Sequence, residues 1–157
     1  MRHAGSMALC IDKITGSRER NPMGNCLKVG ILGAGNIAGS MAEALNELQK
    51  EGKACAYAVA SRSQEKALEF ARKWNITRAY SSYEELASDP EVDLIYIATP
   101  HSLHYEQAKL CIEHGKNVLV EKAFTANARQ AEELFAMAEE KKVFITEAIW
   151  TRYMPSR

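Results

Sequence analysis

The sequence predicts an α/β fold in which a doubly wound parallel sheet carries helices on both faces. Apolar runs of strand length alternate along the chain with segments whose apolar residues recur at helical spacing. The runs are apolar throughout instead of alternating with polar residues, which is typical of parallel strands buried on both sides. A glycine-rich turn joins the first strand to the first helix. Together these observations indicate the Rossmann type of fold.

The first strand and helix frame a turn suited to a phosphate group. An apolar run ends at Gly33, and the helix after the turn has its apolar face at Ile37, Met41, Ala44, Leu45 and Leu48. In this G-x-G-x-x-A pattern, the glycines allow a tight turn and close approach of a pyrophosphate, and the alanine allows close packing of helix on strand. The helix then directs its N-terminal amides at the anion. The predicted cofactor contacts are Gly33, Gly35, Asn36, Ile37 and Ala38.

The next strand is expected at residues 54–60, with Ser63 as the N-cap of the helix that follows it. The apolar face of this helix consists of Ala67, Phe70, Ala71 and Trp74. Residues 79–80 form a short edge strand. Ser81 and Glu84 then have the spacing of a capping box for a brief helix.

The second half of the chain repeats the alternation of strand and helix. Strands are expected at residues 94–98, 118–120 and 143–145. A helix covers residues 103–114 and ends at Gly115. Asn127 begins the last helix, whose inward face consists of Ala131, Leu134, Phe135 and Ala138.

Unusual polar clusters follow the strands at the points where they end. The glycine turn follows the first strand, Ser61 and Arg62 follow the second, Thr99-Pro100-His101 follows the fourth, and Glu121-Lys122 follows the fifth. In open parallel sheets, ligands bind outside the carboxyl ends of the strands. The sequence therefore predicts a ligand site at this edge.

The second strand ends without a carboxylate. An NAD site uses an acidic side chain here to accept hydrogen bonds from the ribose hydroxyls, whereas an arginine suits a 2'-phosphate. Arg62 can pair with that phosphate or stack on adenine, and Lys66 lies one helical turn further along. We therefore expect Ser61, Arg62 and Lys66 to bind NADP, with NAD as the alternative cofactor. The other interpretation is two solvated charges at a helix start.

Lys122 ends an apolar strand, so the sheet holds its stem while its ammonium group extends over the edge. Near a carbonyl or alcohol oxygen it could polarise the bond or stabilise an alkoxide. From position alone, a surface lysine that only ends a strand remains the competing interpretation. Glu121 either binds a ribose hydroxyl or pairs with a surface cation.

Histidines gather near the start of the helix at residues 103–114. His101 and His104 are three residues apart, but no other ligand cluster accompanies them, so we expect no metal site. His101 is predicted to donate a hydrogen bond to a phosphate. His114 is predicted to be a cation at the helix C-terminus.

Composition excludes several classes of function. The chain has 157 residues, and its 20 lysines and arginines balance 20 aspartates and glutamates, so no overall charge favours nucleic acid or an anionic membrane. No apolar stretch approaches transmembrane length. The 4 cysteines form no C-x-x-C pair, and we expect free thiols in a reducing, cytoplasmic location.

Residues 1–26 differ from the rest of the chain because they lack sustained periodicity. We expect a disordered leader at 1–26, a dinucleotide-binding domain at 27–148, and the start of a connection to a further domain at 149–157.

Several motifs together resemble the Gfo/Idh/MocA family of oxidoreductases, and within it the branch of trans-1,2-dihydrobenzene-1,2-diol dehydrogenases and NADP-linked D-xylose dehydrogenases. The resemblance covers residues 27–157. The motifs are the glycine turn, Ser61-Arg62-Ser63, Ala98-Thr99-Pro100-His101, Glu121-Lys122 and the stretch from Glu147 to Arg152.

The resemblance implies NADP-dependent oxidation of a small sugar, polyol or cyclic diol. By position, Lys122 is similar to the family's catalytic lysine and also contacts substrate, and Arg62 and Lys66 are similar to its 2'-phosphate ligands. Trp150 is similar to a wall of the substrate pocket, and Arg152 reaches cofactor or substrate. We expect a homo-oligomer for the full-length protein and no nucleic acid or membrane partner.

Two features depart from the family pattern. The family's Glu-Lys-Pro is Glu121-Lys122-Ala123 here, so the fixed φ of proline after the lysine is lost. Family members also continue into a C-terminal α/β substrate domain, which is absent before Arg157. We therefore expect this chain to be the inactive cofactor-binding half of a dehydrogenase. The alternatives are a non-catalytic dinucleotide-binding module or sensor subunit, and a nucleotide-sugar or lactone enzyme on the same fold.

Overall fold

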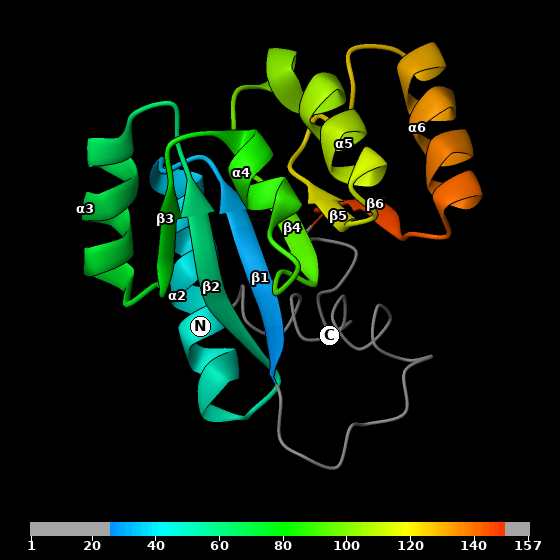
Figure 1. The fold of residues 1–157 in the computed structure, drawn as a ribbon. Coiled ribbons are helices and arrows are strands. Elements are labelled where there is room, and N and C mark those ends of the chain that lie inside the picture. Colours follow the sequence, from blue (N-terminus) through cyan, green and yellow to red (C-terminus); the bar gives the residue numbers. More distant parts are fainter. Residues whose placement is uncertain (1–25, 150–157) are drawn as a thin grey trace, which may run out of the picture.

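The computed structural model describes residues 26–149, and its centre is a six-stranded parallel sheet in the order β3-β2-β1-β4-β5-β6 (Figure 1). The strands are β1 (Leu27–Leu32), β2 (Ala54–Ala60), β3 (Arg78–Tyr80), β4 (Leu94–Ile97), β5 (Asn117–Val120) and β6 (Ile145–Glu147). The direction of winding reverses between β1 and β4. In sheets of this kind the ligand crevice lies at that reversal.

Helices cover both faces of the sheet, as predicted. They are α2 (Asn36–Lys50), α3 (Gln64–Trp74), α4 (Tyr83–Ser88), the 3-10 turn η1 (His101–Leu103), α5 (His104–Glu113) and α6 (Ala128–Lys141). α2 and α3 contribute to one apolar cluster, and α4, α5 and α6 contribute to the other (Figure 1). The fold class is therefore the predicted doubly wound α/β fold.

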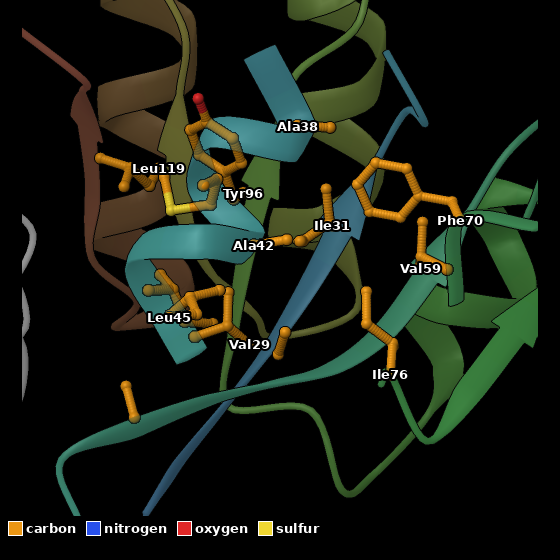
Figure 2. Close-up of a cluster of buried hydrophobic side chains, with 14 of the residues drawn as sticks. Val29, Ile31, Ala38, Ala42, Leu45, Val59, Phe70, Ile76, Tyr96 and Leu119 are labelled. Atoms are coloured by element: carbon orange, nitrogen blue, oxygen red, sulfur yellow. The ribbon is translucent and has the colours of Figure 1, made fainter. Parts of the chain in front are cut away.

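Successive strand residues divide between the two clusters because side chains alternate across a strand. On β4, Tyr96 packs on the α2 side, whereas Ile95 and Ile97 pack on the other side. Figure 2 shows the α2 side, where Ile31 and Ala42 lie close to each other at the centre. Both faces of the sheet are therefore covered, which explains why its central strands are mainly apolar.

Most of the predicted helix boundaries are confirmed, and one cap is shifted. Ser63 and Asn127 cap α3 and α6 as predicted. The capping box of α4 is formed by Ser82 and Glu85, so the prediction of Ser81 and Glu84 was wrong by one residue. The Glu85 carboxylate accepts hydrogen bonds from the amides of both serines, at 3.2 Å each. In an ordinary capping box the carboxylate accepts from one backbone amide, whereas Glu85 accepts from two.

Three further expectations were wrong in detail. Ile37 and Phe135 were assigned to inward helix faces, but they are 52% and 51% exposed. Ile37 lies in the first turn of α2. Phe135 instead stacks on Phe124, with ring centroids 5.3 Å apart. The last strand begins at Ile145, two residues later than predicted, because the Val143 amide donates to the Ala138 carbonyl of α6 and the Phe144 amide donates to the Asn117 side chain. The helix predicted at residues 103–114 is confirmed as α5, within one residue at each end, and η1 precedes it.

The domain of residues 27–148 lies almost wholly within β1 to β6. Residues 1–25 of the predicted leader and residues 150–157 lie outside the described residues. No helix among residues 26–149 is both long and apolar enough to span a membrane.

The turn after β1 brings two backbone segments unusually close. Gly33 has φ +104°, and a Cβ added to it would lie 2.8 Å from the carbonyl oxygen of Ala98. Only glycine adopts this φ without strain and leaves room for that carbonyl. In addition, Ala38 in the first turn of α2 is fully buried. The small residues of the predicted pattern therefore pack α2 against the end of the sheet.

Gly33 should tolerate substitution far less well than Gly35. Gly33→Ala combines a positive φ with a backbone clash, and we expect it to lower the free energy of unfolding by about 2–4 kcal/mol. Gly35 has φ −96°, and a Cβ there meets nothing within 4 Å. Gly35→Ala should therefore cost less than about 1 kcal/mol. Urea unfolding of both variants measures the difference, and equal costs would contradict it.

Candidate functional site

The four central strands end level with one another. Their last residues pair across the sheet in one row: Ala60, Leu32, Ile97 and Val120. Each predicted polar cluster begins within two residues of this row. The structure therefore brings the four clusters together at the carboxyl edge of the sheet, on both sides of the reversal between β1 and β4.

The N-terminus of α2 is open towards this edge. Gly35 is its N-cap, no side chain among the described residues caps it, and its first turn contains no acidic residue. The first amides of a helix have no partner within the helix, and they carry the positive end of its dipole. Gly35, Asn36 and Ile37 are exposed, and the space beside Gly35 is free of protein atoms. These residues fit a pyrophosphate group.

A groove of about 810 Å³ continues from this turn between α2 and α3. Gly35 and Asn36 line one part of it, and Lys66 and Trp74 line another. It therefore connects the open helix N-terminus to the first turn of α3.

The β2–α3 turn presents two cations. Arg62 and Lys66 are exposed, whereas Ser61 is half-buried. The Ser63 hydroxyl accepts a hydrogen bond from the Lys66 amide at 3.4 Å, which places Lys66 in the first turn of α3. Within residues 26–149, neither Arg62 nor Lys66 forms an ion pair. Both charges are thus available to an anionic group.

The turn after β4 has a buried side and an exposed side. The Thr99 hydroxyl donates a hydrogen bond to the Gln107 side chain of α5, which anchors the turn. Pro100 and His101 are exposed at the edge. The His101 ring lies edge-on to the His104 ring, with centroids 5.3 Å apart. His101 is therefore exposed at the carboxyl edge of the sheet, in the segment that follows β4.

The segment that carries Lys122 is held by hydrogen bonds from several elements. The Glu121 amide donates to the Ile97 carbonyl at 3.0 Å, and the Lys122 amide donates to the Glu121 carboxylate at 3.2 Å. The Phe124 amide donates to the Glu147 carboxylate at 2.9 Å. The Lys122 side chain is exposed, and the peptide bond between Lys122 and Ala123 is cis. Without a proline at 123, the segment is fixed by contacts from distant parts of the chain.

Tyr96 is a contributor to the site that the sequence analysis missed. Its ring is buried in the core, and its hydroxyl donates a hydrogen bond to the Glu121 carboxylate. Figure 2 shows the hydroxyl at the outer end of the apolar cluster. Burial, and then the charge of Glu121, raise the pKa of Tyr96 far above its usual value, so the hydroxyl remains a donor. One tyrosine among the apolar residues of a strand gave no signal of this role.

His104 is the second missed contributor. In the sequence, His104 stands out only as a possible partner of His101 in a metal site, but its side chain is fully buried. Its Nδ1 lies 2.8 Å from the Ala123 carbonyl oxygen, and its Nε2 lies 2.9 Å from the Thr99 carbonyl oxygen. In the described part of the chain, no three His, Cys, Asp or Glu side chains form a cluster that could hold a metal ion. His104 therefore joins the turn after β4 to the segment after β5.

His114 lies at the C-terminal end of α5, as predicted. Its Nε2 is 3.2 Å from a carboxylate oxygen of Glu84. Two other predicted site residues, Trp150 and Arg152, lie outside the described residues.

The geometry agrees with the comparison to known proteins. The sequence pattern of the Gfo/Idh/MocA oxidoreductases, whose domain is an NAD-binding Rossmann fold, matches residues 27–148. The chain belongs to this family. The match covers the whole sheet from β1 to β6 and all the helices that pack on it.

Relatives within the Gfo/Idh/MocA family include trans-1,2-dihydrobenzene-1,2-diol dehydrogenases. The enzyme of Xenopus tropicalis is 43% identical over 128 residues, which are 82% of this chain and 38% of the relative. The D-xylose 1-dehydrogenase (NADP(+)) of Hypocrea jecorina is 41% identical over 138 residues, which cover 82% of this chain and 35% of that enzyme. The chain thus spans less than two fifths of the length of these relatives.

Solved structures of similar proteins have the same fold. An NAD binding oxidoreductase from Klebsiella pneumoniae has a TM-score of 0.73 and 32% identity, over 78% of this chain and 34% of that chain. A 3-ketoreductase from Actinomadura kijaniata in complex with NADP has a TM-score of 0.71 and 33% identity, over 78% of this chain and 38% of that chain.

Proposed function

We propose that the chain is the cofactor-binding part of an NADP-dependent dehydrogenase that acts on a CH–OH group of a small sugar, polyol or cyclic diol. The observation that carries the proposal is the level row of strand ends, which brings the open N-terminus of α2, the Arg62–Lys66 pair and Lys122 to one edge. The names of the diol and xylose dehydrogenases support the class of reaction. The substrate and a homo-oligomeric assembly of the full-length protein are parts of this proposal.

Each cluster would hold a different part of the cofactor. The amides at Gly35, Asn36 and Ile37 would bind the pyrophosphate, close to the backbone turn at Gly33. Arg62 and Lys66 would bind the 2'-phosphate, because the turn that directly follows β2 contains the cation Arg62 and no carboxylate, and Lys66 lies in the first turn of α3. Ser61 would bind beside them, at the half-buried start of the same turn.

The other clusters would bind nearer the reacting end. Thr99, Pro100 and His101 would contact the cofactor across the crevice, with a phosphate as the partner of His101. Glu121, held by Tyr96, would accept a hydrogen bond from a ribose hydroxyl. The bound cofactor would supply the hydride transfer to or from the substrate carbon.

Lys122 is the proposed catalytic residue. Lys122 is exposed directly after Glu121 at the carboxyl end of β5, and its ammonium group would donate a hydrogen bond to the reacting oxygen of the substrate. It would stabilise negative charge on that oxygen and help to move its proton. Trp150 would form a wall of the substrate pocket, and Arg152 would reach cofactor or substrate.

The two cations Arg62 and Lys66 predict that NADPH binds more tightly than NADH. Arg62→Ala should weaken NADPH binding by about 10- to 100-fold, since a hydrogen-bonded charge pair contributes about 1.5–3 kcal/mol. NADH binding should change little, because NADH lacks the 2'-phosphate. Isothermal calorimetry with both cofactors measures this difference.

The matched control is Arg72→Ala, which removes the same charge from an exposed position in the last turn of α3. It should leave both affinities unchanged. Equal affinity of the unsubstituted chain for NADPH and NADH, or the same loss in both arginine variants, would rule out the 2'-phosphate site.

The proposed role of Lys122 predicts a loss of turnover without a loss of cofactor. In a form of the protein as long as its relatives, Lys122→Met should lower kcat by about 100-fold or more, the usual scale for losing one acid–base or oxyanion partner. The affinity for NADPH should stay within a few fold. The control is Lys141→Met in the last turn of α6, which should behave as the unsubstituted protein.

Steady-state kinetics and calorimetry separate this proposal from its main alternative. Near-normal turnover in Lys122→Met would mean that the chemistry depends on another residue. Tight NADPH binding without turnover of any diol or sugar, in both the unsubstituted protein and Lys122→Met, would instead favour a non-catalytic binding module.

A further inference from the structure

We propose that His104 is a positioning residue for Lys122. It holds the carbonyl group of Ala123, the residue after the lysine, against the turn that follows β4. The inference rests on the proposed function, in which Lys122 contacts the reacting oxygen. His104 itself touches neither the cofactor nor the substrate, because its side chain is fully buried.

The two ends of the imidazole ring contact two different parts of the site. Nδ1 lies 2.8 Å from the Ala123 carbonyl oxygen, and Nε2 lies 2.9 Å from the Thr99 carbonyl oxygen. Thr99 is itself anchored to α5 through Gln107. The ring therefore lies between the β4–α5 turn and the backbone beside Lys122, and it fixes the position of that backbone relative to the turn.

The other hydrogen bonds of this segment are made on either side of Ala123, and His104 supplies the bond at Ala123 itself. On the N-terminal side of Lys122, Glu121 is bonded to Ile97 and to Tyr96. On the C-terminal side, the next bond after that of Ala123 is made by the Phe124 amide. The bond from His104 thus controls the direction in which the chain leaves Lys122, and so the position of the lysine backbone.

The bond requires a proton on Nδ1, because the carbonyl oxygen of Ala123 can only accept. A neutral ring donates one hydrogen bond, and a doubly protonated ring donates two. Nδ1 must therefore carry a proton, whether or not Nε2 is also protonated. This assignment can be observed directly in the unsubstituted chain.

Two substitutions separate the two ends of the ring. The side-chain amide nitrogen of asparagine can occupy the place of Nδ1, whereas that of glutamine can occupy the place of Nε2. His104→Asn should therefore keep the bond to Ala123, whereas His104→Gln should lose it and donate to the Thr99 carbonyl instead. A residue with only a packing role would show no such difference between the two variants.

The structural readout uses NMR spectra without cofactor. In the unsubstituted chain, the long-range ¹H–¹⁵N spectrum should show Nδ1 of His104 as a protonated nitrogen. The Phe124 amide correlates with the Ala123 carbonyl carbon, whose resonance should move in His104→Gln to the position of a carbonyl without that bond and stay in place in His104→Asn. An unprotonated Nδ1 in the unsubstituted chain would overturn the proposal even if a variant fails to fold. With both variants folded, a carbonyl resonance that is the same in both would also overturn it.

The functional readout uses a form of the protein as long as its relatives. His104→Gln should lower kcat at least tenfold with little change in the KM for NADPH, and His104→Asn should restore most of that loss. His114→Gln, at the other end of α5, is the control and should change neither value. Equal kcat in His104→Gln and His104→Asn would overturn the positioning role.

The proposed function and the positioning role fail in different ways. If Lys122→Met keeps its turnover while the NMR signatures are as expected, the role of Lys122 is wrong and the bond from His104 stands. If Lys122→Met is inactive but His104→Gln is as active as His104→Asn, the role of Lys122 stands and the positioning role of His104 is wrong.

Discussion

The site depends on the close approach of the Gly33 turn to the backbone at Ala98. A Cβ at Gly33 would lie 2.8 Å from the Ala98 carbonyl oxygen, so glycine is required for the ends of β1 and β4 to meet. These two strands flank the reversal in the winding of the sheet, where sheets of this kind bind their ligands. The same turn leads into the open N-terminus of α2. The packing of β1 on β4 and the position of the proposed phosphate site therefore depend on one contact.

A second constraint acts on the other side of the reversal between β1 and β4, on the segment that follows β5. The segment from Glu121 to Phe124 contains no proline, but its backbone is bonded to groups that come from β4, α5 and β6. Such bonds close long loops, and they form only once the sheet has assembled. The position of Lys122 is thus a property of the whole domain, and changes at Tyr96 or His104 would reach it without touching a ligand.

The sequence was sufficient to predict the fold because the central strands β1, β2, β4 and β5 are largely buried and most of the helices have a recognisable cap or apolar face. One error arose because two neighbouring serines, Ser81 and Ser82, are equally suitable N-caps for α4. Another arose because a tertiary contact, the stacking of Phe135 on Phe124, determines where the Phe135 side chain lies. The edge at which the clusters meet followed from the rule for parallel strands. The roles of Tyr96 and His104 did not, because their partners are 25 and 19 residues away and carry no local pattern.

The most direct test of this account is to map the NADP site by the amide ¹H and ¹⁵N shifts of the chain during titration with NADP. The account predicts the largest shifts at Gly35, Asn36, Arg62 and Thr99, on both sides of the reversal between β1 and β4. Gly52 and Gly115, which follow the C-terminal ends of α2 and α5, should not shift. Saturable shifts confined to those glycines, or no saturable shifts at all, would contradict it.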